Sequence, residues 1–131
     1  MTDVLARIPY ARFLGLRTQM EADEMTVIMP FQDKLIGNPL LPALHGGSTA
    51  AMLELTAVAR VALSFPRLRL PKPINVSVAY LRSGRPRDVH AQARIGKAGR
   101  RVAHVTVEAW QEDRANPIAT LSAHFLIAED A

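Results

Sequence analysis

The order of apolar patterns along the chain constrains its fold most. After a pair of glycines, Gly46 and Gly47, apolar residues recur at helical spacing between residues 50 and 62. From Ile74 onward the pattern changes to strict alternation, which predicts half-buried strands. These alternating stretches cover residues 74–80, 89–95, 103–109 and 119–127. One long helix beside many strands predicts an α+β fold in which a curved antiparallel sheet wraps a central helix.

The remaining segments complete a sheet of about six strands. A short helical stretch is expected between Val4 and Leu14, followed by strands near residues 14–20 and 25–29. Residues 37–42 contain glycine, asparagine and two prolines, which disfavour regular structure before His45. Turn residues at 96–99 and 112–117 predict hairpins, so the strands that they join should pair antiparallel.

Composition limits the class of protein. A chain of 131 residues is most simply one domain, and we expect residues 1–131 to form it. The chain has no cysteine, so thiol catalysis and disulfides are excluded. We find neither a secretory signal nor an apolar segment long enough to span a membrane, and we expect a cytoplasmic protein without a membrane partner. A net charge of +4 suits an anionic ligand, but no aromatic-rich basic motif supports nucleic-acid binding.

Glu54 is the first candidate for a functional residue. Its neighbours three and four positions away on the predicted helix are all small or apolar: Ala50, Ala51, Ala57 and Val58. Burying a carboxylate among such residues is costly, and proteins keep one there chiefly where its chemistry is used. The glycines before the helix would let a substrate approach, and unpaired N–H groups at a helix start bind negative charge. The alternatives are a surface glutamate and a simple tight turn.

Two separated motifs resemble one family. His45-Gly46-Gly47 begins the helix, and Glu54 follows the histidine by nine residues. The stretch from Tyr80 to Asp88 reads Tyr-Leu-Arg-Ser-Gly-Arg-Pro-Arg-Asp. In this order the motifs resemble the hotdog-fold thioesterases of the phenylacetic-acid-degradation type, whose second motif is Tyr-Leu-Arg-Pro-Ala-Arg-x-Gly-Asp. The resemblance covers nearly the whole chain and implies an acyl-CoA thioesterase, a thioester hydrolase.

The resemblance also implies roles for individual residues. Glu54 matches the catalytic carboxylate, which acts as a general base or as a nucleophile. Gly46 matches the residue whose backbone N–H stabilises the oxyanion. His45 would orient the loop by hydrogen bonding, although proton transfer stays open as an alternative. Asn38 matches the polar side chain that holds the water or the carbonyl, but it lies seven residues before His45 where the family has six.

The implied substrate carries coenzyme A, which is expected as part of the substrate, and no separate cofactor is expected. Gly47 would allow its close approach, and four arginines are candidates for contacts with its phosphates: Arg82, Arg85, Arg100 and Arg101. No metal is expected, since the remaining histidines, His90, His104 and His124, show no ligand spacing. The resemblance implies a homo-oligomer, either a dimer or a dimer of dimers, with its sites between subunits.

One departure from the family keeps a second function open. Members often carry a serine or threonine at the start of the strand after the helix, where this chain has Lys72 and Pro73. Asn75 or Ser77 could supply the missing polar group. Without it, the chain could be an acyl-CoA-binding or regulatory module that does not cleave. A hydratase or dehydratase of the same fold is a third alternative, but the expected histidine and acid arrangement is absent from the sequence.

Overall fold

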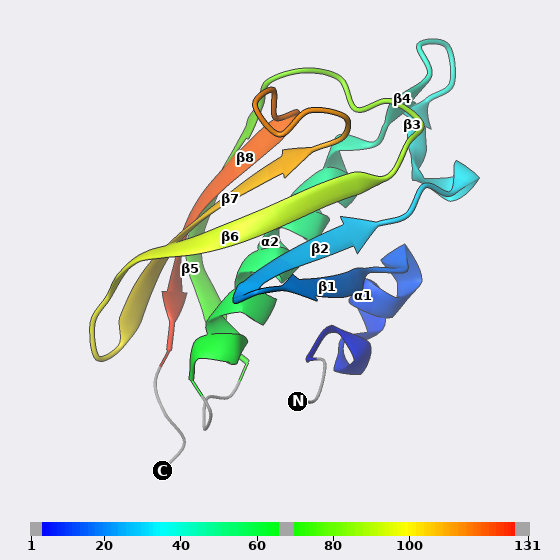
Figure 1. Ribbon diagram of the computed structural model, residues 1–131. Coiled ribbons are helices and arrows are strands. Elements are labelled where there is room, and N and C mark those ends of the chain that lie inside the picture. The colour runs from blue at the N-terminus through cyan, green and yellow to red at the C-terminus, as the bar shows by residue number, and fades with distance from the viewer. Residues whose placement is uncertain (1–3, 66–69, 128–131) are drawn as a thin grey trace.

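A curved antiparallel sheet packs against one long helix, as the computed structural model shows for residues 4–65 and 70–127 (Figure 1). The helix is α2 (Gly46–Ser64). The six strands of the sheet are β1 (Arg17–Glu21), β2 (Glu24–Met29), β5 (Lys72–Tyr80), β6 (Val89–Ala98), β7 (Val102–Trp110) and β8 (Ala119–Leu126). Their order is β1-β2-β6-β7-β8-β5, with antiparallel pairing between all neighbours. The expected α+β fold is therefore confirmed.

The segments before α2 form short elements. The expected helical start consists of a 3-10 helix η1 (Val4–Arg7) and α1 (Pro9–Leu14). A second 3-10 helix, η2 (Asp33–Leu35), leads into β3 (Ile36–Asn38), which pairs with β4 (Ala43–Leu44). The prediction that residues 37–42 lack regular structure is thus wrong for Gly37 and Asn38, because the chain folds back and pairs with itself across the turn of residues 39–42. None of the described helices is long and apolar enough to cross a membrane.

The core lies between α2 and the inner face of the sheet. Alternation along β7 and β8 sends every second side chain toward the helix, and Val105, Ala123 and Phe125 are fully buried there. The facing stripe of α2 supplies Met52 and Leu53, which are also fully buried. Burial of this apolar surface is the main stabilising contribution to the fold, at roughly 25 cal/mol for each Å² removed from water.

Two irregularities shift the expected positions of residues. The sequence predicts a turn from Gly96 to Gly99, but β6 continues to Ala98. The register shift between Ile95 and Lys97 marks a bulge at Gly96, where the strand bends without ending. A second register shift in β5, between Pro73 and Asn75, takes Ile74 out of the alternation that Val76 continues.

Strand β5 forms one edge of the sheet and leaves an apolar surface open. It pairs with β8 on one side, and no other described strand pairs with its second side. Val76 and Tyr80 face the helix side of the sheet together with Ala123 and Ala119 of β8. They nevertheless stay 38% and 57% exposed. An apolar, unpaired edge of this kind is suited to a second protein surface.

Candidate active site

The start of α2 is built around His45, which caps the helix. The His45 carbonyl accepts hydrogen bonds from the backbone N–H groups of Ser48 and Thr49, at 3.1 and 3.3 Å. Its ring Nδ1 accepts the N–H of Gly47 at 2.9 Å. Because Nδ1 accepts here, the neutral ring carries its proton on Nε2. Of the four N–H groups that lack a partner within the helix, His45 therefore satisfies those of Gly47 and Ser48, and its own N–H donates to the Leu35 carbonyl at 2.8 Å.

The fourth N–H, that of Gly46, is left over. Among the described residues no acceptor lies within hydrogen-bonding distance of it. The Gly46 carbonyl, by contrast, accepts the hydroxyl of Tyr80 at 2.8 Å. An unpaired N–H at the positive end of a helix dipole is suited to a developing negative charge. Of the two glycines, Gly46 offers a free donor, whereas the N–H of Gly47 is taken by the His45 ring.

Close packing explains both glycines. A Cβ atom on Gly47 would lie 2.9 Å from Cε1 and Nδ1 of the His45 ring, so a side chain there would push the imidazole out of its capping position. A Cβ atom on Gly46 would lie 3.3 Å from the ring of Tyr80. Gly47 is therefore required for the cap, while its exposed backbone still leaves room for a ligand.

Glu54 lies two turns further along α2 and is half-buried. It shares a helix face with Gly47, Ala50 and Ala51, and none of these four residues is fully buried by the chain itself. No group in the described part of the chain forms a hydrogen bond or an ion pair with its carboxylate. The result is a partly desolvated, unpaired carboxylate on a face of small residues.

A cavity of about 360 Å³ adjoins the start of the helix. Gly46, Tyr80 and Arg82 line it, together with Leu44 and Thr49. A neighbouring hollow of about 510 Å³ shares Arg82 with it and continues to Arg85. Gly46 thus lines the first hollow, Arg85 lines the second, and Arg82 lines both.

The loop from residue 81 to residue 88 holds these arginines in place. The backbone N–H of Arg85 donates to Gln111 Oε1 at 3.0 Å, and Gln111 Nε2 donates back to the Arg85 carbonyl at 2.8 Å. Asp88 accepts the N–H of Phe31 at 2.7 Å and fixes the end of the loop. Among the described residues Arg87 pairs with Glu112, whereas neither Arg82 nor Arg85 meets a carboxylate.

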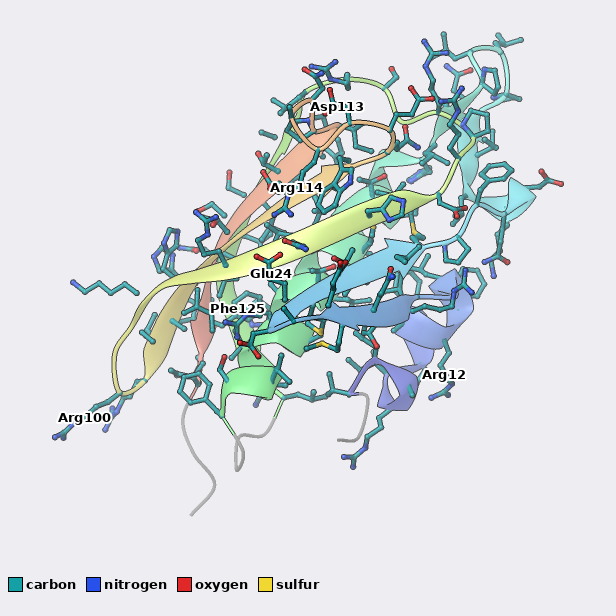
Figure 2. The ribbon with its side chains drawn as sticks, viewed as in Figure 1. Arg12, Glu24, Arg100, Asp113, Arg114 and Phe125 are labelled. Atoms are coloured by element: carbon teal, nitrogen blue, oxygen red, sulfur yellow. The ribbon has the colours of Figure 1, made fainter. Side chains whose placement is uncertain are left out.

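Arg100 and Arg101 lie elsewhere. They occupy the turn between β6 and β7, at the end of the sheet away from the loop that carries Arg82 (Figure 2). The structure therefore brings two of the four predicted phosphate contacts together within one chain and separates the other two from them.

The candidates for positioning water do not face Glu54. Asn38 is the last residue of β3, where its Oδ1 accepts the N–H of Leu40 at 3.0 Å. Asn75 bonds through Oδ1 to Nδ1 of His124 at 2.9 Å, on the sheet face that points away from α2. Ser77 pairs with Ser122 on that same outer face. None of these three side chains is directed toward the start of α2 within one chain.

The other histidines belong to the outer face of the sheet. His104 and His124 are direct neighbours on β7 and β8, with ring centroids 4.8 Å apart, and His90 stacks on Trp110 at 5.9 Å. Within residues 4–65 and 70–127, no group of three or more metal-ligating side chains is found.

Comparison with known proteins identifies the family. A sequence model described as the acyl-CoA thioesterase N-terminal domain matches residues 38–126, which include both the helix start and the arginine loop. The chain belongs to the acyl-CoA thioesterase family. As a member of this family it is a thioester hydrolase, and the resemblance expected from the two motifs is confirmed. No curated protein matches the chain.

Solved structures share this thioesterase fold. A protein from Chromobacterium violaceum is 35% identical, with 97% of this chain and 88% of that chain covered and a TM-score of 0.79. A putative thioesterase from Ralstonia eutropha, related to phenylacetic acid degradation, is 22% identical over 92% of this chain and 90% of that chain, with a TM-score of 0.80. A Bacillus halodurans protein solved with CoA is 20% identical over 98% of this chain and 88% of that chain, with a TM-score of 0.82.

The geometry of the cap predicts how a methyl group added at Gly47 changes the stability of the thioesterase. Gly47→Ala should lower the free energy of unfolding by about 1 kcal/mol, since the new Cβ displaces the His45 ring and leaves an N–H unpaired. Gly99→Ala is the matched control, because a Cβ there meets only the Val102 carbonyl, at 3.7 Å. Urea unfolding of both variants measures the difference. Equal stability of the two would contradict the capping role of His45.

Proposed function

We propose that the protein hydrolyses acyl-CoA thioesters with Glu54 as general base or nucleophile and the Gly46 N–H as oxyanion donor. The observation that carries this proposal is the state of Glu54, which is half-buried, unpaired and set on a face of small residues. A carboxylate that only stabilised the helix would be expected to have a partner or full exposure. The free N–H of Gly46 supplies the complementary donor.

The reaction needs only these two groups and water. Either Glu54 removes a proton from a water molecule that attacks the thioester carbon, or its carboxylate attacks that carbon and water later cleaves the resulting anhydride. In both routes the carbonyl oxygen becomes negatively charged, and the Gly46 N–H stabilises it. The C–S bond then breaks, and the coenzyme A sulfur takes up a proton. The products are a free acid and the thiol.

Coenzyme A is the acyl carrier that the arginines favour. Arg82 and Arg85 are exposed, have no carboxylate partner among the described residues, and line two neighbouring hollows, the first of which Gly46 also lines. Guanidinium groups bind phosphate with fixed charge and forked donors. The Bacillus halodurans relative of the same fold was solved with CoA, which agrees with this assignment.

The geometry of α2 favours a site shared by two chains. Gly46 and Glu54 are eight residues apart on one helix, which separates their Cα atoms by roughly 12 Å. A thioester carbonyl must lie about 3 Å from both its donor and its attacking group. A second copy with an antiparallel α2 would bring Glu54 of one chain beside Gly46 of the other. We therefore propose a homodimer with two such sites.

The edge strand β5 is the proposed contact. Two β5 strands that pair antiparallel across a twofold axis would extend the sheet through both chains and place their α2 helices on the same face. The same contact would cover the exposed side chains of Val76 and Tyr80. Further pairing into a tetramer, and a cytoplasmic location, stay predictions from the sequence.

One observation favours the alternative of a binding module without chemistry. Asn38, Asn75 and Ser77 are committed to other contacts or face away from α2, so none of the three candidates from the sequence would hold the attacking water beside Glu54 of the same chain. If Glu54 acts as a nucleophile, its first step needs no positioned water, and the protein would still release thiol. If no acyl-CoA tested is turned over, the binding module is favoured.

Replacement of the two reacting groups tests the mechanism. Glu54→Gln should abolish thiol release from acyl-CoA while the protein remains folded. Gly46→Pro removes the unpaired N–H at the start of α2, and proline fits the first position of a helix, where the preceding His45 already has ψ 127°. We expect turnover to fall about 10²- to 10³-fold.

Gly46→Ala is the matched control for the proline variant. It brings the same Cβ to within 3.3 Å of the Tyr80 ring but keeps the N–H, so it should retain most of the activity lost in Gly46→Pro. Steady-state thiol release measures all three variants. Unchanged turnover in Glu54→Gln would contradict the proposed mechanism.

The arginine assignment predicts a difference between two surface positions. Arg82→Ala should raise the KM for acyl-CoA several-fold with little change in kcat, since it removes a contact to the carrier and not to the reacting carbonyl. Arg100→Ala, at the far turn, should leave both constants unchanged if each phosphate is bound by the loop of residues 81–88. A phosphate-free N-acylcysteamine thioester should not distinguish Arg82→Ala from the parent. A larger effect at Arg100 would contradict the assignment.

A further inference from the structure

The peptide unit between Gly46 and Gly47 is held at both ends. Its carbonyl oxygen accepts the Tyr80 hydroxyl at 2.8 Å, and its N–H donates to His45 Nδ1 at 2.9 Å. Because a peptide unit is planar, two bonds at opposite ends fix the orientation of its plane. The hydroxyl, the peptide and the imidazole form one continuous chain of hydrogen bonds, in which each bond polarises the next.

This peptide needs external support because both of its residues are glycines. Glycine has the widest conformational freedom, so a helix that begins with two of them has a loosely determined first turn. The ring of Tyr80 packs directly against Gly46, where an added Cβ would lie 3.3 Å from Cε1 and 3.4 Å from the hydroxyl. Tyr80 thus restrains Gly46 both by a hydrogen bond and by contact.

We infer that Tyr80 is a positioning residue for the oxyanion donor. Tyr80, on the neighbouring strand β5, holds the Gly46 carbonyl and places its ring against Gly46, so it restrains the φ and ψ of the residue that carries the N–H. The N–H itself belongs to the preceding peptide unit, whose His45 carbonyl accepts the N–H groups of Ser48 and Thr49. With that unit held by the cap, the torsions of Gly46 set how the N–H lies relative to the cavity that Gly46 and Tyr80 both line. The Tyr80 hydroxyl proton is engaged by the Gly46 carbonyl and is not available to the substrate. This inference rests on the proposed function, which makes the Gly46 N–H the oxyanion donor.

The sequence allows a conservative test. Tyr80→Phe keeps the ring contact with Gly46 and removes only the hydroxyl. Displacement of a reacting group by a fraction of an ångström is costly, so kcat on acyl-CoA should fall about ten- to a hundredfold while KM stays within about twofold. Tyr10→Phe is the matched control, because Tyr10 is the other tyrosine of the chain and lies on α1 (Pro9–Leu14). It should leave both constants unchanged.

A readout independent of activity separates this inference from the proposed function. The chain has seven glycines, so ¹⁵N-glycine labelling gives few amide signals. Gly46 alone follows a histidine and Gly47 alone follows a glycine, so ¹³C-carbonyl labelling of those residue types assigns both signals. In Tyr80→Phe the signals of Gly46 and Gly47 should shift or broaden, and those of glycines remote from the site, such as Gly15 and Gly99, should not.

Each outcome decides the inference. Shifted Gly46 and Gly47 signals together with a fall in kcat support it. Unshifted signals overturn it whether or not the parent protein is active, as does a raised KM with unchanged kcat, which would make Tyr80 a substrate contact. If the parent releases no thiol, the proposed function fails, and shifted signals then show a structural clamp only, which also overturns the catalytic part of the inference.

Discussion

The interaction on which the rest of the site depends is the cap that His45 forms on α2. A single residue uses its carbonyl and its ring to satisfy the N–H groups of Gly47, Ser48 and Thr49, and it leaves the N–H of Gly46 unpaired. A serine or aspartate cap would also satisfy N–H groups, but the imidazole occupies the volume in which a side chain at Gly47 would lie. The His-Gly-Gly sequence is therefore one structural unit, which leaves the Gly46 N–H as an unpaired donor in a residue that lines an open cavity.

The same helix explains why a single chain looks incomplete. Its inner stripe is covered by the sheet, whereas the face with Gly47, Ala50, Ala51 and Glu54 stays partly open, as does the helix side of β5. Both open surfaces are apolar or small, and both would be covered by a twofold partner aligned along β5. The proposed twofold dimer would remove both surfaces from water and would bring Glu54 of one chain close to Gly46 of the other.

Much of this arrangement could be predicted from the sequence, for identifiable physical reasons. Period-two alternation fixed β7 and β8 because one face of each is fully buried, and the glycine-bounded helical pattern located α2. Bulges at Gly96 and Ile74 could not be predicted, since a local register shift depends on the neighbouring strand. The separation of Arg100 from Arg82 and the role of Tyr80 depend on tertiary contacts, although Tyr80 already began the second motif.

The most direct measurement of the central claim combines the two inactive variants. Glu54→Gln and Gly46→Pro chains carrying different affinity tags are coexpressed, and hybrid dimers are purified through both tags. If each site takes Gly46 from one chain and Glu54 from the other, a hybrid has one intact site of two and should recover about half of the parent activity. Hybrids as inactive as the two single variants would contradict a site shared between chains.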